Sequence, residues 1–213
     1  MLFDMDGVLI SSIGSVERCW KRWAKQYDVP DADNYVVPHG VRAADTIRSL
    51  KPEFDAAAVA EGVRVIEQME IDDTADLKVL PGAKALLESL PADRWAIVTS
   101  ATHRLTLARL AAAGLPLPDR LISADMVKRG KPDPEPYRRG AELLGLSPAD
   151  CIVVEDAPSG VRAGVAAGSR VLAVTTTHPA VELERATWTA ASLEQVQASV
   201  SADAIKLQIV TSR

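Results

Sequence analysis

The chain has 213 residues, 47% of them hydrophobic and 25% charged, which suffices for one domain or for a core domain with a small insert. This composition excludes an intrinsically disordered chain, and no apolar run approaches the ~18 residues of a membrane span. The net charge of −5 argues against nucleic acid as a partner but leaves small anions open, because an acidic protein can hold a local positive site.

The N-terminal segment and the cysteines indicate the compartment. Residues 1–6 predict a short buried strand ending at Gly7, and no basic stretch precedes an apolar one, so we expect no signal peptide. Only three residues precede Asp4, so either this strand is short or the natural chain starts upstream. Cys19 and Cys151 lack zinc-site spacing and are expected to be buried thiols in a reducing compartment. These features predict a cytoplasmic protein.

An all-helical segment is expected next, over about residues 12–78. Apolar residues recur there at helical spacing, which predicts helices over about residues 15–27, 43–50 and 55–70. Trp20, Trp23 and Tyr27 form a stripe on the first of these helices. Such a stripe is more typical of packing between helices than of a ligand platform.

Strands and helices alternate in the rest of the chain. The expected strands cover residues 95–98, 121–122, 152–154 and 171–174, and the expected helices cover 83–90, 105–113, 134–144 and 160–167. Because the strands are apolar without alternation, we expect a parallel sheet covered on both faces. Residues 205–209 alternate and suit an edge strand with one face in water. The predicted fold is a doubly wound α/β core, formed by residues 1–11 and 79–213, with an inserted helical cap at 12–78.

Polar side chains follow several of the predicted strands. They form four groups: Asp4-Met5-Asp6-Gly7, Thr99-Ser100, Lys131 and Glu155-Asp156. Active sites of open α/β sheets lie beyond the carboxyl ends of the strands, so these groups should meet there, under the helical cap. Two carboxylate clusters, a hydroxyl and a lysine suit Mg²⁺ and a phosphate, and a carboxylate is a plausible nucleophile.

Each of these groups also has a purely structural interpretation. Asp-x-Asp-Gly is a turn or calcium-loop signature, and Lys131 could be a solvated loop lysine. Ser100 and the Glu155-Asp156 pair could cap helices. Each of these interpretations is common by itself, but the joint occurrence of all four groups at one sheet edge favours a catalytic site.

The four groups, in this order and spacing, resemble the motifs of the haloacid dehalogenase (HAD) superfamily over about residues 2–175. The matching segments are residues 3–9, 98–100, 130–134 and 155–160. The helical insert is similar to the cap of the subgroup that holds small-metabolite phosphatases and β-phosphoglucomutase. Ser11 stands where relatives often carry Asp, a departure that affects a cap-hinge contact and not the chemistry.

The resemblance implies roles for the acidic residues. Asp4 would be the nucleophile and a metal ligand. Asp6 would be the general acid/base, with its backbone carbonyl on the metal. Asp156 would complete the Mg²⁺ site, and Glu155 would be a ligand directly or through water.

The resemblance also implies how phosphate is held. The Ser100 hydroxyl and the Ala101 N–H would bind the phosphate, and Lys131 would pair with both the phosphate and Asp4. In the cap, the loop His39-Gly40-Val41-Arg42 should face the core site. It resembles the His-Gly segment of hexitol, glycerol and deoxysugar phosphatases, so His39, Gly40 and Arg42 are candidate substrate contacts, although a loop His and Arg are often only solvated.

The leading functional hypothesis is therefore hydrolysis of a small sugar or polyol phosphate through an aspartyl phosphate on Asp4. A β-phosphoglucomutase-like phosphomutase with the same residues is the first alternative, and a non-catalytic metabolite sensor is the alternative of another class. A dehalogenase is disfavoured, because Asp6, Gly7 and the acidic fourth motif point to a metal site. The expected partner is a small phosphorylated molecule, with no nucleic acid, membrane or obligate protein partner.

Overall fold

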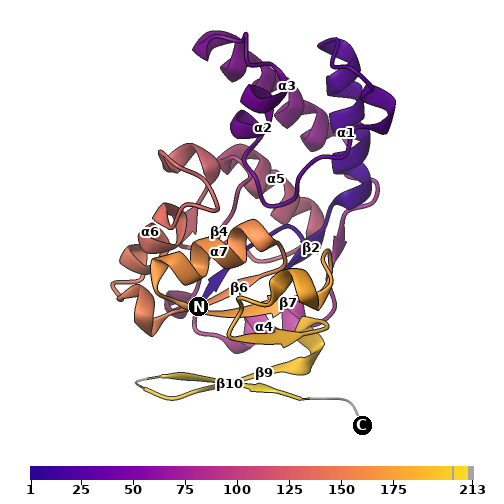
Figure 1. The fold of residues 1–213 in the computed structure, drawn as a ribbon. Helices are drawn as coiled ribbons and strands as arrows, with labels where there is room; N and C mark the ends of the chain where they lie inside the picture. Colours follow the sequence, from indigo (N-terminus) through magenta and orange to yellow (C-terminus); the bar gives the residue numbers. More distant parts are fainter. Residues whose placement is uncertain (203, 211–213) are drawn as a thin grey trace.

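The centre of the molecule is a six-stranded parallel sheet. The computed structural model describes residues 1–202 and 204–210. The strand order is β5-β4-β1-β6-β7-β8, with every neighbouring pair parallel. Strands β4, β6 and β7 of this sheet are labelled in Figure 1. The strands are β1 (Leu2–Phe3), β4 (Ala96–Val98), β5 (Leu121–Ile122), β6 (Ile152–Glu155), β7 (Arg170–Val174) and β8 (Trp188–Ala190). The predicted doubly wound α/β fold is thus confirmed.

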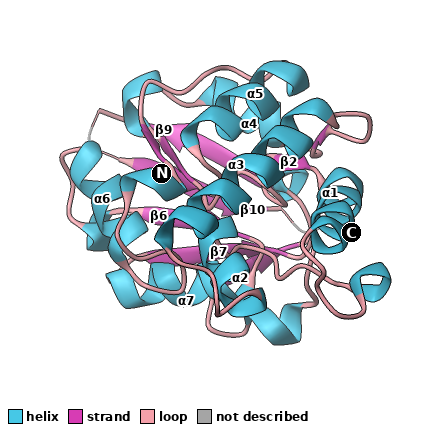
Figure 2. Ribbon diagram, turned by 90° about the horizontal axis from the view of Figure 1, so that it is seen from above, coloured by secondary structure: helices cyan, strands magenta, loops and turns pink. Residues whose placement is uncertain are grey.

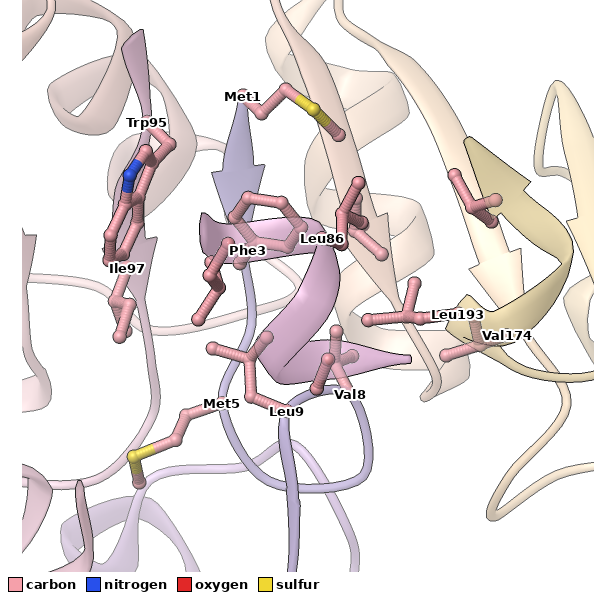
Figure 3. Packing of buried hydrophobic residues seen from close by; sticks show 14 of the residues in the cluster. Met1, Phe3, Met5, Val8, Leu9, Leu86, Trp95, Ile97, Val174 and Leu193 are labelled. Carbon is pink, nitrogen blue, oxygen red and sulfur yellow. The ribbon is translucent and has the colours of Figure 1, made fainter. Parts of the chain in front are cut away.

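Helices cover both faces of this sheet. Helices α4 (Ala83–Ser89) and α5 (His103–Ala113) lie on one side, and α6 (Glu135–Leu143) and α7 (Pro158–Ala167) lie on the other (Figure 2). Alternate strand residues point to opposite sides, because the side-chain period of a strand is two. Figure 3 shows the α4 side, where Phe3 and Ile97 of the sheet pack with Leu86 of α4 and with Trp95.

The first strand is short but central. It has only two residues, and it pairs with β4 on one side and β6 on the other, so that Leu2 lies opposite Ala96 and Val153. The Asp4 N–H extends the ladder by donating to the Val154 carbonyl at 3.0 Å. Asp4 therefore lies at the carboxyl end of the middle of the sheet.

Three helices form a separate layer above the carboxyl ends of the strands (Figure 1). They are α1 (Ile13–Gln26), α2 (Ala43–Leu50) and α3 (Ala56–Asp72), and they have a hydrophobic cluster of their own. The Trp23 side chain is fully buried, stacks on Tyr27 at 4.4 Å between ring centroids, and donates to the Gly62 carbonyl at 3.0 Å. The predicted packing role of the aromatic stripe is confirmed.

Two short strands connect this helical layer to the sheet. They are β2 (Ile10–Ser11) and β3 (Lys78–Val79), and they pair in antiparallel fashion. The chain therefore leaves and re-enters the core side by side, close to the predicted limits of the cap at residues 12 and 78. The division into two domains at these residues stays a prediction.

The C-terminal hairpin differs from a simple extension of the main sheet. Strands β9 (Val196–Val200) and β10 (Ile205–Ile209) form a separate antiparallel pair that packs against α4 (Figure 1). The predicted strand at 205–209 forms, but its neighbour is β9, and β8 is the edge of the main sheet. Alternating hydrophobicity indicates one wet face and carries no information about the pairing partner. None of the helices within 1–202 and 204–210 has the length and apolar character needed to cross a membrane.

Candidate active site

The Asp4 carboxylate and the Lys131 ammonium form a buried pair at the sheet edge. The Lys131 Nζ lies 3.0 Å from Asp4 Oδ1 and 2.7 Å from Glu155 Oε1, and it donates to the Val98 carbonyl at 3.0 Å. Only 2% of Lys131 and 3% of Asp4 are exposed, so the loop lysine is not a solvated one. The structure thus brings the predicted nucleophile, the predicted lysine and the fourth motif together.

Glu155 is fully buried and holds Lys131. Its Oε1 accepts from Lys131 and, at 2.6 Å, from the Tyr137 hydroxyl, while its Oε2 accepts from the Asp156 and Ala157 N–H groups at 3.0 and 3.3 Å. Burial raises the pKa of Tyr137 well above its ordinary value, so the phenol keeps the proton that it donates. Because both carboxylate oxygens are engaged, these contacts favour a positioning role for Glu155. Its role as a metal ligand stays a prediction.

The acidic cluster fits a divalent cation. Oxygens of Asp4, Glu155 and Asp156 lie within 4.8 Å of one another. Within the described part of the chain, Asp4 Oδ1 and Asp156 Oδ1 are buried and accept no hydrogen bond; the Lys131 contact to Asp4 is an ion pair only. Burial raises the pKa of Asp4 to about 7 against the opposing effect of Lys131, and it raises that of Asp156 well above its ordinary value. A hard cation bound by these oxygens would keep both groups ionised, so the donor set suits Mg²⁺.

The turn after Asp6 allows this close arrangement of carboxylates. Gly7 has a φ of +81°, and a Cβ on it would collide with the Asp156 carboxylate. The Thr176 hydroxyl donates to the Gly7 carbonyl, and the Thr177 hydroxyl donates to Asp156 Oδ2. The glycine of the first motif is therefore required for the fourth motif to reach it.

Asp6 turns toward the helical layer. Its Oδ1 accepts from the Ser12 hydroxyl at 2.7 Å, and its Oδ2 accepts from Arg109 Nη1 at 2.9 Å. Its side chain is 30% exposed, in contrast to the buried Asp4. The two carboxylates of the first motif thus have different surroundings, as a nucleophile and an acid/base need.

The groups predicted to bind phosphate are engaged within the protein. The Ser100 hydroxyl donates to the Gly40 carbonyl at 2.9 Å, and the Ala101 N–H donates to the Thr99 hydroxyl at 3.1 Å. Both groups line the cavity described below. Phosphate binding by these two donors therefore requires that they exchange their present hydrogen bonds.

The predicted cap loop docks on the core through its main chain. Gly40 has a φ of +73°, and a Cβ on it would lie 2.6 Å from the Ser159 hydroxyl. The Ser159 and Ser100 hydroxyls donate to the carbonyls of His39 and Gly40, at 3.4 and 2.9 Å. The His39 ring stands edge-on to His178 at 5.9 Å between centroids, and burial lowers the pKa of His39, which favours a neutral imidazole.

Arg42 is a link between cap and core. Its Nε lies 2.7 Å from Asp45 Oδ2, and its Nη1 donates to the carbonyls of Val127 and Lys128 at 3.1 and 3.3 Å. These partners occupy the guanidinium that the sequence assigned to the substrate. A docking role for Arg42 was not expected, and a substrate contact by this residue stays a prediction.

A cavity of about 230 Å³ lies between the core and the helical layer. It is lined by the predicted substrate-side residues except Lys131, together with apolar side chains of the cap. Its lining includes Asp4, Asp6, Ser100, Ala101, His39, Gly40, Arg42, Val16, Trp20, Ile66, Glu70 and Arg109. Lys131, Glu155 and Asp156 are not among the lining residues, and they lie buried beside Asp4.

Several residues of the site were missed by sequence reasoning: Ser12, Glu70, Arg109, Tyr137, Thr177 and His178. Thr177 and His178 come shortly after β7, so the rule that polar residues at strand ends meet at one edge could have found them. Glu70, Arg109 and Tyr137 lie within helices, where a single polar residue gives no such signal.

Comparison with known proteins agrees with this geometry. A sequence model of the haloacid dehalogenase-like hydrolases matches residues 1–168. The chain belongs to this family. This HAD hydrolase is 41% identical over 197 residues to hexitol phosphatase A of Escherichia coli (strain K12), covering 92% of this chain and 91% of that protein. It is 35% identical over 188 residues to glycerol-1-phosphate phosphohydrolase 2 of Saccharomyces cerevisiae (strain ATCC 204508 / S288c), covering 83% and 74%.

A solved structure shares the fold of this HAD hydrolase. The crystal structure of a hydrolase from Pseudomonas syringae superposes with a TM-score of 0.80 at 22% identity, covering 91% of this chain and 93% of that one. The predicted family and the predicted enzyme class, a phosphatase, are confirmed by these relationships.

The buried carboxylates of this HAD hydrolase should lower its stability when no metal is bound. The pKa of Asp4, about 7, and that of Asp156 lie above the unfolded value of about 4, so the folded state loses stability as pH rises through that interval. We expect Asp156→Asn to raise the Tm of the metal-free protein at neutral pH by a few degrees, and to show no Tm increase with Mg²⁺, in contrast to the increase that we expect for the wild type.

Thermal unfolding with excess chelator and with Mg²⁺ measures both effects. Asp119→Asn, at an exposed loop position, should leave both Tm values unchanged. A lower Tm for metal-free Asp156→Asn would show that Lys131 already neutralises the cluster.

Proposed function

We propose that this enzyme hydrolyses a small sugar or polyol phosphate, through transfer of the phosphoryl group to Asp4 and with Mg²⁺ as cofactor. The observation that carries the proposal is the buried Asp4–Lys131 ion pair at a cavity covered by the cap, where neither Asp4 Oδ1 nor the neighbouring Asp156 Oδ1 accepts a hydrogen bond within the described chain. The names of the relatives, a hexitol phosphatase and a glycerol-1-phosphate phosphohydrolase, support the substrate class.

Two carboxylates divide the chemistry. The Asp4 carboxylate attacks phosphorus, the bond from phosphorus to the leaving oxygen breaks, and Asp6 gives that oxygen a proton. Asp6 then takes a proton from water, which attacks the phosphorus of the aspartyl phosphate and releases inorganic phosphate. Asp4, Asp156 and the Asp6 carbonyl would hold Mg²⁺, which when bound would neutralise charge on the phosphoryl oxygens. Lys131, which does not line the cavity, balances charge at Asp4.

The cavity matches a small leaving portion. Its volume of about 230 Å³ admits a phosphate with a short polyol, and the cap supplies apolar walls through Val16, Trp20 and Ile66. A macromolecular substrate would have to lift the cap loop off Ser100 and Ser159. The cavity therefore favours a small phosphorylated metabolite as the partner, and the lack of nucleic-acid, membrane and obligate protein partners stays a prediction, as does the cytoplasmic location.

A phosphate-release screen over sugar and polyol phosphates, with and without Mg²⁺, tests the proposal. Mg²⁺-dependent release of inorganic phosphate is the expected result. Conversion of a sugar phosphate into an isomer without phosphate release would establish the phosphomutase alternative. Binding without any turnover would establish the sensor.

His39 is expected to select the substrate. His39 is among the residues that line the cavity, whereas the loop is held to the core by main-chain carbonyls, so His39→Ala should remove the side chain without undocking the loop. We expect kcat/KM for the best polyol phosphate to fall about tenfold, because a substrate hydroxyl loses its partner in a closed site. Turnover of p-nitrophenyl phosphate, which lacks such hydroxyls, should change much less.

Two variants serve as controls for this prediction. Arg42→Ala should lower kcat/KM for both substrates by similar factors, because it breaks the link between the cap and the carbonyls of Val127 and Lys128. His103→Ala, at the start of α5 and outside the cavity lining, should leave both unchanged. Equal losses on both substrates for His39→Ala would mean that the side chain serves closure and not selection.

A further inference from the structure

A chain of three ionisable side chains, two of them buried, connects the core to the cap. Arg109 on α5 is 3% exposed; its Nη1 lies 2.9 Å from Asp6 Oδ2, and its Nη2 lies 3.6 Å from Glu70 Oε2. Glu70, on α3, is 7% exposed. Helix α3 packs against α5 at this point. Asp6, Arg109 and Glu70 thus come from the turn after β1, from the core and from the cap.

Burial of the Arg109 guanidinium costs free energy, and the hydrogen bonds of this group do not offset that cost. Among the residues that the structure describes, Arg109 Nε and Nη2 have no hydrogen-bond partner. Unpaired buried donors destabilise a fold, so an apolar side chain would pack this position at lower cost. A guanidinium stays charged in a protein even when it is buried. Among the described residues, the Asp6 carboxylate is the nearest charged partner of this guanidinium.

We propose that Arg109 is a positioning residue for Asp6, and that Glu70 of the cap holds Arg109 in place. The inference rests on the acid/base role of Asp6 in the proposed function. Ser12 fixes Oδ1 and Arg109 fixes Oδ2, so the carboxyl plane cannot rotate while both contacts persist. Loss of Arg109 releases one oxygen, and Asp6 then meets the leaving oxygen in the correct orientation only part of the time.

The effect of a poorly positioned Asp6 on the reaction rate depends on the leaving group. An alkyl phosphate must receive a proton as its oxygen departs, whereas p-nitrophenolate departs unprotonated as a weakly basic anion. The value of kcat/KM reports steps only up to that departure, so water attack on the aspartyl phosphate does not enter it. A defect in positioning Asp6 should therefore lower kcat/KM for the alkyl ester and spare the aryl ester.

The test measures kcat/KM for a glycerol phosphate and for p-nitrophenyl phosphate. We expect Arg109→Gln to lower the first about a hundredfold and the second by no more than about threefold, in the range of general acid catalysis. Arg109→Lys, which keeps the charge, should recover part of the lost kcat/KM for the alkyl ester. Glu70→Gln should also lower kcat/KM for the alkyl ester more than for the aryl ester, but by a smaller factor of about ten. If Arg109→Gln lowers kcat/KM for both esters by equal factors, the proposal is wrong.

The chain offers a matched control on the same helix. Arg104 on α5 also pairs with a cap carboxylate, since its Nη1 lies 2.9 Å from Glu67 Oε2, but its side chain is 59% exposed and it does not contact Asp6. Arg104→Gln should change kcat/KM for both esters by the same small factor. A preference for the aryl ester in Arg104→Gln equal to that in Arg109→Gln would show that cap docking, and not Asp6, is responsible.

A double variant separates this inference from the proposed function. In an Asp6→Asn background, Arg109→Gln should add little further loss on the alkyl ester, because both changes remove the same contribution. If Asp6→Asn itself treats both esters alike, the acid role in the proposed function is wrong. If Asp6→Asn discriminates and neither Arg109→Lys nor Arg109→Gln does, only the role of Arg109 is wrong. Should Arg109→Gln fail to fold, Arg109→Lys and Glu70→Gln provide the same comparison.

Discussion

Asp4→Asn is expected to lower kcat by at least about a thousandfold, because it removes the proposed covalent nucleophile. The structure makes this substitution a clean test. Asp4 is held by the strand ladder through its N–H to Val154, so the backbone does not depend on the charge. The amide keeps the shape of the side chain and relieves a buried carboxylate whose pKa is raised to about 7 by burial. The variant should therefore fold while losing activity.

The measurement is steady-state phosphate release together with the Tm of each protein. Trapping of a phosphorylated protein with acid should succeed in the wild type and fail in Asp4→Asn. Asp119→Asn, in an exposed loop, is the matched control and should keep full activity. Full activity of Asp4→Asn would remove the proposed covalent mechanism, and a phosphorylated Asp4→Asn protein would place the nucleophile elsewhere.

Lys131→Ala should be inactive or nearly so, while Lys128→Ala stays close to the wild type. Lys131 is buried between Asp4 and Glu155, and loss of a charge that stabilises phosphoryl transfer is expected to cost about 3 kcal/mol. Lys128 is exposed, and its contacts to Arg42 and Glu135 use only its backbone. Initial rates for the two variants on one substrate make the comparison.

Stability must be measured beside these rates. Lys131→Ala leaves Glu155 buried without its cation, and breaking a buried pair in this way is expected to cost about 3–5 kcal/mol. A lower Tm at neutral pH is therefore part of the prediction, and circular dichroism at the assay temperature separates unfolding from lost chemistry. Equal effects of the two substitutions on rate would mean that the loop at 130–134 does not serve the phosphoryl site.

The sheet and its edge could be predicted from the sequence because they depend on local patterns. Apolar runs at 96–98 and 152–154 mark buried strands, and parallel strands bring their carboxyl ends together whatever lies between them. Asp4, Lys131 and Glu155 could be placed near one another on that basis alone. The short first strand is also explained, since two ladders hold Leu2 and Phe3 from both sides.

The contacts between cap and core could not be predicted in the same way. Arg109 lies in a helix that carries a second arginine, Arg104, and nothing in the local sequence shows that Asp6 and Glu70 flank Arg109 and not Arg104. Arg42 is a predicted substrate contact because its loop is expected to face the core site and resembles the His-Gly segment of sugar and polyol phosphatases, but its guanidinium binds Asp45, three residues later, and the carbonyl of Val127. Such pairings exist only once the cap is docked.

The way in which the cap loop is anchored bears on how this enzyme can acquire new substrates. Ser100 and Ser159 hold carbonyl groups, which every amino acid possesses, so the anchor does not depend on the side chain at position 39. Substitution of His39 would then change the side chain that is proposed to face the leaving portion of the substrate, while the loop stays docked on the core. Gene duplication followed by single substitutions at this position would give related enzymes with different substrates and the same catalytic core. No variant along this path would lose the ability of its cap to close on the core.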